Sequence, residues 1–107
     1  MFEEPKRKVV IRESAIESAL CKAAKKRFMI PYKFTSPGRV GVPDRLIVAP
    51  FGDHGFVEVK APGKLPTPAQ LREHDVLRQM GHKVFVLDNF NDIESVLDAI
   101  QPPSLPG

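Results

Sequence analysis

Three charged residues in two short apolar segments have the types and spacing of a hydrolytic metal site. Asp44 opens the segment DRLIVAP, and Glu58 and Lys60 lie two residues apart in GFVEVK. Alternate side chains of a β-strand share a face, so Glu58 and Lys60 point the same way. If the two segments pair antiparallel, Asp44 lies near the Lys60 end. Two carboxylates and one ammonium group then converge at one edge of a sheet.

Converging carboxylates suit a hard divalent cation such as Mg²⁺ or Mn²⁺. Such a cation supports phosphodiester hydrolysis, while Lys60 orients the attacking water or offsets charge that develops on the phosphorus. The alternative is a solvent-facing strand with a cross-strand ion pair, which is common and contributes little. Because these strands are short, apolar and flanked by predicted helices, a charged cluster is costly unless it is hydrated or binds an ion. The pattern therefore favours an ion site.

The elements that position these residues are predicted in the order α-β-β-β-α-β-α. Helices are expected over 14–27, over 68–80 after a cap at Thr67, and from 91 or 92 to 100; strands are expected over 32–36, 44–49, 56–60 and 83–87. The first three strands form a meander. The fourth follows a helix and lies parallel to a neighbour, which needs a crossover of this length. The fold class is therefore α/β, with a small mixed β-sheet flanked by helices.

The length of 107 residues allows one domain with one core. We expect a loose segment over 1–12, the domain over 13–100, and a disordered, proline-rich tail over 101–107. No apolar run is long enough to span a bilayer, and the charged N-terminus lacks the features of a signal peptide. With its single cysteine, the chain is expected in a reducing, cytoplasmic compartment, without a membrane partner.

The net charge of +3 weakly favours an anionic partner, and the distribution of the basic residues says more. Arg39 and Arg45 flank the Pro-Asp pair, and Lys64 follows the EVK segment. Together with Lys26, at the end of the first helix, they are predicted to contact nucleic-acid phosphates. Lys26 belongs to a cluster at the end of that helix with Lys22, Lys25 and Arg27. For this cluster alone, the simpler explanation is that the cations offset the helix dipole.

Four segments carry a resemblance to a known family. ESAIESAL, SPGRVGVPDRLIV, FVEVKAPGKLPTPAQ and LRQMGHKVFVLDN occur in the order of the corresponding motifs of the virus-type replication-repair nuclease (VRR-NUC) domain. The pair PD, a spacer and EVK also resembles the looser PD-(D/E)XK nuclease signature. Over roughly 13–100, the chain resembles the short standalone form of the VRR-NUC family found in phages and bacteria. The resemblance implies a restriction-endonuclease-like core.

The resemblance also implies roles for individual residues. Asp44 and Glu58 correspond to metal ligands, the backbone carbonyl of Val59 to a further ligand, and Lys60 to the catalytic lysine. The family has a glutamate on the first helix that helps to hold a metal or its water. Both Glu13 and Glu17 qualify for that role, and Glu17 is preferred.

Gln70 corresponds to the glutamine with which the family begins the helix after the EVK strand. Both helical residues have a structural alternative, because Ser14 with Glu17 and Thr67 with Gln70 each fit a capping box. In a capping box, either side chain would simply satisfy a backbone N–H group. For Gln70 the two roles are compatible, since it can cap the helix and face the site.

The function that the resemblance implies is hydrolysis of DNA phosphodiester bonds with Mg²⁺, for which Mn²⁺ substitutes. The standalone family suggests a homodimer whose paired sites act on four-way (Holliday) junctions, in the cytoplasm of a bacterial or phage-infected cell. One alternative is a non-catalytic DNA-binding module of the same fold. Another is a nuclease acting on flaps, single strands or RNA, which would use the same catalytic residues.

Overall fold

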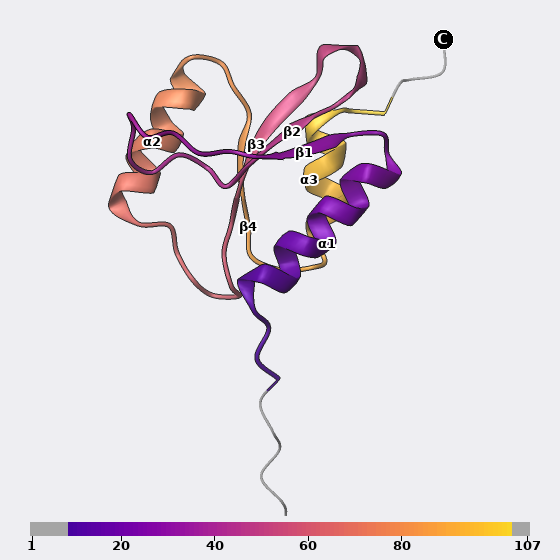
Figure 1. Ribbon diagram of the computed structural model, residues 1–107, viewed down its shortest axis with the longest axis horizontal. Helices are drawn as coiled ribbons and strands as arrows, with labels where there is room; N and C mark the ends of the chain where they lie inside the picture. Colours follow the sequence, from indigo (N-terminus) through magenta and orange to yellow (C-terminus); the bar gives the residue numbers. More distant parts are fainter. Residues whose placement is uncertain (1–8, 104–107) are drawn as a thin grey trace, which may run out of the picture.

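A computed structural model describes residues 9–103 of the chain and confirms the predicted order of elements (Figure 1). The helices are α1 (Glu13–Lys26), α2 (Pro68–Gln79) and α3 (Ile93–Ile100), with a short 3₁₀ turn at Pro50–Gly52. The strands are β1 (Ile30–Lys33), β2 (Arg45–Val48), β3 (His54–Val59) and β4 (Val84–Leu87). Residues 1–8 of the predicted loose segment and 104–107 of the predicted tail lie outside the described residues.

The four strands form one mixed sheet in the order β1-β2-β3-β4. β1 and β2 pair antiparallel, as do β2 and β3, whereas β3 and β4 pair parallel. This confirms the meander followed by a crossover through α2. The first strand lies earlier than predicted, at 30–33 instead of 32–36, and it contains Pro31. Proline is tolerated there because β1 is an edge strand of the sheet.

The main core lies between the sheet and the pair α1 and α3 (Figure 1). From α1 it receives Ile16 and Leu20, both fully buried. Val57 and Val59 meet them from β3, and α3 completes the core with Ile93, Val96, Leu97 and Ile100. The alternation predicted for β3 is confirmed, because its valines face this core while Glu58 makes its contacts with α2 on the opposite face.

Helix α2 begins at the capping box that the sequence predicted. The Thr67 hydroxyl accepts a hydrogen bond from the Gln70 backbone N–H at 3.2 Å, and the Gln70 side-chain oxygen accepts one from the Thr67 N–H at 2.9 Å. Pro68 occupies the first helical position, where the missing N–H costs nothing. The capping box therefore fixes the residue at which α2 begins. It thereby also determines which face of α2 is directed toward β3.

The loop before β2 approaches α2 through Gly41. This glycine has a φ of +86°, and a Cβ atom at its position would lie 2.5 Å from the Ala69 carbonyl oxygen. Only glycine combines this backbone conformation with so close a contact. Since Asp44 follows three residues later, the contact sets the path by which Asp44 reaches the sheet.

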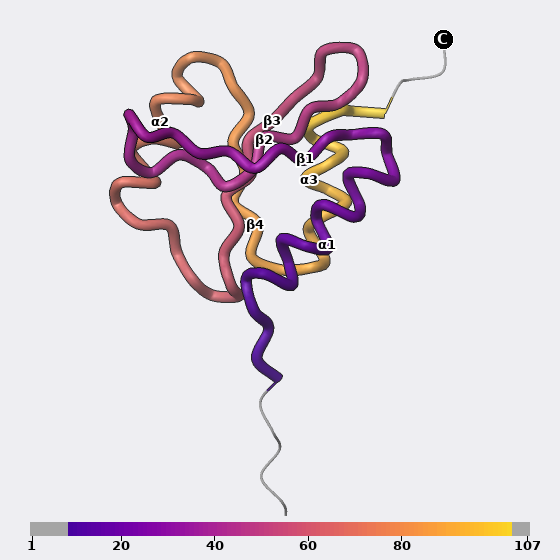
Figure 2. The backbone as a smooth tube through the Cα atoms, in the orientation of Figure 1, coloured from indigo at the N-terminus to yellow at the C-terminus, as the bar shows by residue number. Residues whose placement is uncertain are grey.

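The loop after β3 lies beside the segment that leads into α1. The tube in Figure 2 shows the loop after β3 returning beside the start of α1. Ala61, Pro62 and Lys64 of that loop line a shared pocket with Val9, Val10 and Ile11. The N-terminus of α1 is thereby placed next to the end of β3, where Glu58 and Lys60 lie. In the described residues, no helix has the length and apolar character needed to cross a membrane.

Candidate active site

Asp44 is fixed against the neighbouring strand by a backbone contact. Its Oδ2 accepts a hydrogen bond from the N–H of Val59 at 2.7 Å, and its own carbonyl accepts one from the N–H of Phe34 at 2.9 Å. The N–H and C=O of one strand residue point to the same side of the strand. The carbonyl of Val59 is therefore directed to the side on which the carboxylate of Asp44 lies, as the predicted ligand set requires.

Glu58 lies in the middle of the sheet and is almost fully buried, with 1% of its surface exposed. Two side chains from one face of α2 contact its two oxygens. The Gln70 Nε2 donates to Oε2 at 3.2 Å, and the His74 Nε2 lies 3.3 Å from Oε1. Burial lowers the pKa of His74, so its ring is neutral and the contact is a hydrogen bond rather than an ion pair.

The environment of Glu58 disfavours its charge. Burial, a hydrogen bond shared with Asp44 and the charge of Asp44 raise the pKa of Glu58 to about 8, and Glu13 adds to this effect. Lys60 opposes it, since its positive charge favours the ionised form. Asp44 and Glu58 are thus a carboxylate pair that holds a proton near neutral pH. A divalent cation would replace that proton and satisfy both groups.

The donor set fits Mg²⁺ better than a cation that needs a protein cage. Among residues 9–103, no three His, Cys, Asp or Glu side chains lie close enough to enclose a metal ion. Mg²⁺ is usually bound by one or two carboxylates and keeps several waters, which leaves positions for phosphate oxygens. Asp44, Glu58 and the Val59 carbonyl would supply such an open set of oxygen ligands.

Lys60 follows directly after β3 and is partly exposed at the end of the strand. Its backbone N–H donates to the Leu87 carbonyl at 2.9 Å, so the register with β4 holds the residue in place. No ion pair within the described part of the chain involves its ammonium group. The Lys60 side chain thus provides a positive charge beside Glu58 that is available to a phosphate or a water.

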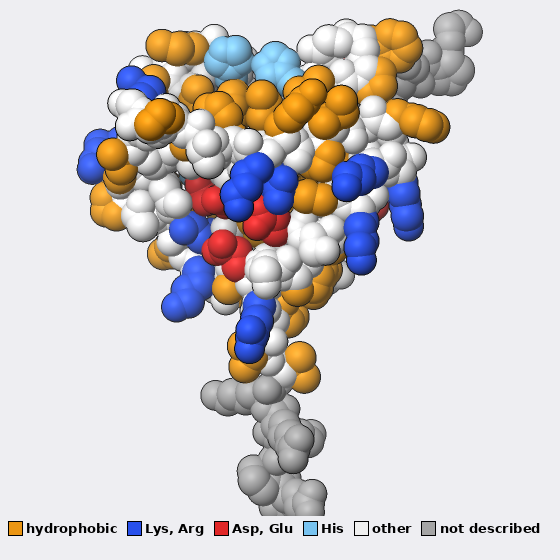
Figure 3. All heavy atoms as spheres, in the orientation of Figure 1, with side chains coloured by type: hydrophobic (Ala, Val, Ile, Leu, Met, Phe, Trp, Pro, Cys, Tyr) orange, Lys and Arg blue, Asp and Glu red, His pale blue; other side chains and the backbone are white. Residues whose placement is uncertain are grey.

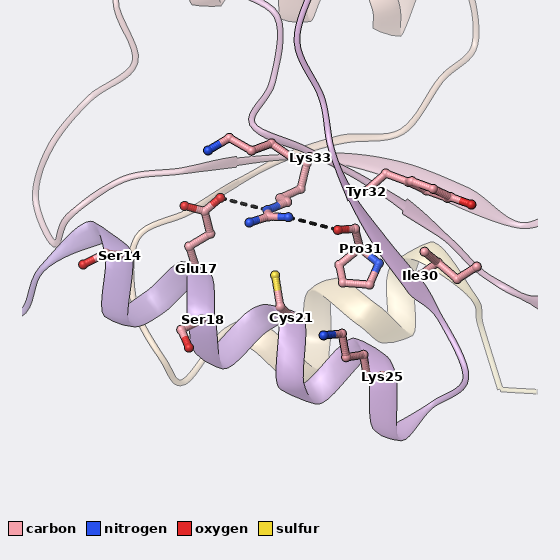
Figure 4. A pocket seen from close by; sticks show the side chains of 10 residues that line it. Ser14, Glu17, Ser18, Cys21, Lys25, Ile30, Pro31, Tyr32 and Lys33 are labelled. Carbon is pink, nitrogen blue, oxygen red and sulfur yellow. Dashed lines mark hydrogen bonds and ion pairs between the residues drawn. The ribbon is translucent and has the colours of Figure 1, made fainter.

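The structure places the two glutamates of the first helix in different surroundings. Glu17 pairs with Arg45, with 2.8 Å between Glu17 Oε2 and Arg45 Nε, across a groove between α1 and β1 (Figure 4). Glu13 instead is the helix carboxylate whose charge acts on Glu58. The sequence favours Glu17 for the family's helix glutamate, and the pairing of its carboxylate with Arg45 makes Glu13 the second candidate, so this assignment stays a prediction. The capping-box alternative for Ser14 and Glu17 is wrong, because the N-cap residue of α1 is Arg12, with no side-chain cap.

We therefore expect Glu13→Gln to impair metal-dependent turnover by roughly tenfold or more, the size of effect typical of outer groups at a metal site. Glu17→Gln should retain turnover to within a few fold and instead lower thermal stability, because Arg45 loses a half-buried partner. Single-turnover cleavage rates and thermal unfolding of both variants make the comparison. Loss of turnover in Glu17→Gln alone would restore the original preference.

Gln70 performs both roles that the sequence left open, because its amide oxygen caps α2 while its amide nitrogen contacts Glu58. His74 was not singled out from the sequence. It lies four residues after Gln70 and so on the same helix face, and that spacing is the signal that could have found it.

The basic side chains predicted to contact nucleic acid differ in exposure and in the partners that already bind them. Arg39 is exposed but held by Glu73 of α2, whose two carboxylate oxygens each lie 2.9 Å from its Nε. Arg45 is half-buried and donates to Glu17 and to the Pro31 carbonyl, so much of its hydrogen-bonding capacity serves the fold. Lys64 is exposed in the loop after β3.

Lys26 is exposed at the C-terminal end of α1. It lies about 20 Å from Glu13 along the helix axis, at about 1.5 Å per residue. Figure 3 shows the resulting charge pattern on one face of the molecule, where acidic side chains gather at the centre with Lys and Arg side chains around them. Positive and negative side chains are therefore adjacent on this face of the molecule.

These features together define a class of protein. A meander joined by a crossover to a parallel fourth strand, with two carboxylates and a lysine at the end of the central strands, is the restriction-endonuclease-like arrangement of nuclease domains. A solved structure described as "VRR_NUC domain" superimposes with a TM-score of 0.76 and 32% sequence identity, over 80% of this chain and 94% of that one.

The sequence comparison agrees with the structural one. A protein described as "Putative nuclease p44", from Acyrthosiphon pisum secondary endosymbiont phage 1, is 54% identical over 91 residues, which cover 85% of this chain and 97% of that protein. No model of a known protein family matches the chain. Identity of this extent over almost the whole relative, with the structural match, shows that the chain belongs to the VRR-NUC family of nuclease domains.

Proposed function

We propose that this protein is a Mg²⁺-dependent DNA endonuclease whose active site is built on Asp44, Glu58 and Lys60. The observation that carries the proposal is the buried Glu58 beside Asp44, a carboxyl pair in which burial and the charge of Asp44 disfavour ionisation of both groups at once in the protein alone. A domain that only bound DNA would gain nothing from converging carboxylates, because they repel phosphate unless a cation lies between them. The nuclease description of the phage relative supports the same conclusion.

In the proposed mechanism, Asp44, Glu58 and the Val59 carbonyl would hold the cation, and Mn²⁺ would substitute for Mg²⁺. The bound cation would supply Lewis-acid activation of a water and of the scissile phosphate. Lys60 orients the attacking water and offsets the negative charge that develops on the phosphoryl oxygens. Glu13 positions a water at the rim, and Gln70 keeps the Glu58 carboxylate turned toward Asp44.

For the substrate, we propose branched DNA, in particular four-way junctions, cut by a homodimer. The likeness to the standalone VRR-NUC family supports this choice. A domain of this size offers little surface for gripping branched DNA alone, whereas a twofold dimer presents two matched sites. The exposed Arg39 and Lys64 would contact the DNA backbone near each site. The phage relative supports a role in the cytoplasm of a bacterial or phage-infected cell.

The test is a cleavage assay on labelled four-way junction, flap, duplex and single-stranded DNA and on RNA, with Mg²⁺ or Mn²⁺. We expect paired, symmetric cuts in the junction by the wild-type protein. Lys60→Ala should lower the cleavage rate by roughly 10²–10³-fold, which is the cost of losing one group that stabilises transition-state charge.

Sedimentation at the assay concentration and junction binding by Lys60→Ala provide the controls. The variant should still bind the junction, so that loss of cutting is not loss of affinity. A monomer would overturn the junction-resolving dimer, and selective cuts in another substrate would replace the junction as the target. Binding without cuts under either metal would make the protein a non-catalytic module.

A further inference from the structure

The α2 face that covers the carboxylate pair contains a buried histidine with an incomplete set of partners. His74 is fully buried, and within the described part of the chain its Nδ1 has no hydrogen-bond partner. Within residues 9–103, the ring makes its one polar contact on the other side, where Nε2 is 3.3 Å from Glu58 Oε1. Burying a polar group with one atom unsatisfied costs free energy that a leucine at this position would not cost. The contact with Glu58 is what this side chain provides in return.

Gln70 and His74 act on the same carboxylate from successive turns of the helix. The Gln70 amide donates to Oε2, while the His74 ring faces Oε1. Two contacts to two oxygens fix both the position and the rotation of a carboxylate, whereas one contact leaves it free to turn. Because Gln70 is also part of the helix cap, the second contact from the rigid middle of α2 completes the support.

The tautomer of His74 follows from the same geometry. A neutral imidazole carries one proton, on Nε2 or on Nδ1. When a bound cation has displaced the Glu58 proton, a proton on His74 Nε2 lets the ring donate to the ionised carboxylate, and the unsatisfied atom is an acceptor. With the proton on Nδ1, a lone pair would face the carboxylate, and a buried N–H would have no acceptor.

We propose that His74 is a positioning residue for the metal site, where its Nε2–H fixes the Glu58 carboxylate in the orientation that binds the divalent cation. The assignment rests on the proposed function, because it gives Glu58 the role of a metal ligand. Hydrogen-bond partners of metal ligands typically contribute 10–100-fold to metal affinity. His74 itself touches neither the cation nor the DNA, and its effect passes through Glu58.

The test compares His74→Phe, which keeps the ring and removes the donor, with His74→Gln, which restores a donor of similar reach. Calorimetric titration of the DNA-free protein with Mn²⁺ should show about 10–100-fold weaker binding for His74→Phe and recovery to within a few fold for His74→Gln. Exposed His82 gives the matched control, and His82→Gln should bind as the wild type does. In cleavage, His74→Phe should need a correspondingly higher metal concentration and approach the wild-type rate at saturation.

A second measurement uses the wild-type protein and so does not depend on whether a variant folds. Nitrogen-15 spectra of the Mg²⁺-loaded protein, with His74 assigned by comparison with His74→Gln, should show the proton on Nε2. A proton on Nδ1, or wild-type Mn²⁺ affinity in a folded His74→Phe, would overturn the assignment. If the wild-type protein binds neither Mg²⁺ nor Mn²⁺, both the proposed function and this assignment are overturned. If the wild-type protein binds Mn²⁺ and His74→Phe binds it equally well, only the assignment of His74 is overturned.

Discussion

A Glu58→Gln variant is expected to lose metal-dependent cleavage while gaining stability in the absence of metal. The amide keeps the shape of the side chain but gives a hard cation a much poorer ligand, so the loss should reach roughly 10²–10⁴-fold. The same change removes a carboxyl group whose ionisation is disfavoured by burial and by Asp44. At pH 8 or above, a gain of about 1 kcal/mol or more would raise the melting temperature by roughly 4–8 °C.

Cleavage under single-turnover conditions and thermal unfolding in a metal chelator give the two measurements. Glu94→Gln is a suitable control, because Glu94 is an exposed glutamate on α3 that pairs with Arg27 away from the site. It should retain cleavage and gain no stability. If Glu58→Gln were instead less stable than the wild type at pH 8 or above, the carboxylate would be contributing to the fold, and the picture of an unsatisfied pair would be wrong.

Metal binding is expected to depend steeply on pH up to about 8. Because burial and Asp44 raise the pKa of Glu58 to about 8, its carboxyl group is protonated at pH 6 and 7 in the metal-free protein. The cation must displace this proton, so the apparent affinity for Mn²⁺ should rise about tenfold per pH unit from pH 6 to 8 and level off above. Calorimetry in buffers of different ionisation enthalpy measures both the affinity and the released proton.

The same pKa has the opposite consequence for metal-free stability. The folded state binds the Glu58 proton more tightly than the unfolded chain does, where the pKa is near 4.5. The stability that this proton contributes is full below about pH 4.5 and is lost as the pH rises to about 8. The free energy of unfolding is measured at each pH for the wild type and for Glu58→Gln. The difference between the two proteins isolates the contribution of Glu58, because all other titrating groups are shared. An Mn²⁺ affinity that stayed flat from pH 6 to 8 would contradict both statements.

The sequence was informative about the candidate site because its arrangement follows local rules. Asp44 precedes β2, Glu58 lies in β3 and Lys60 follows β3. The alternation of side chains and the antiparallel pairing of these two strands, which a short turn joins, suffice to bring the three residues together. The capping box at Thr67 and Gln70 is equally local, and the structure confirms it. The parallel fourth strand followed from chain topology rather than from any single residue.

The parts that the sequence leaves open depend on contacts between distant segments. Glu13 and Glu17 are four residues apart and lie on nearly the same helix face, so periodicity cannot separate them. What separates them is Arg45, which comes from β2 and pairs with Glu17. Gly41 likewise has no local pattern that reveals its close contact with Ala69. His74 could be recognised as a partner of Glu58 only once α2 was placed over β3.

The proline in β1 has a consequence for self-association. An exposed edge strand is a template to which a second chain can add a strand and so extend the sheet, which is a common route to aggregation. Pro31 has no N–H to offer such a strand, and its carbonyl already accepts a hydrogen bond from Arg45 at 3.0 Å. Continuous strand addition is therefore disfavoured at this edge, because an added strand would find neither a backbone donor nor a free carbonyl at Pro31.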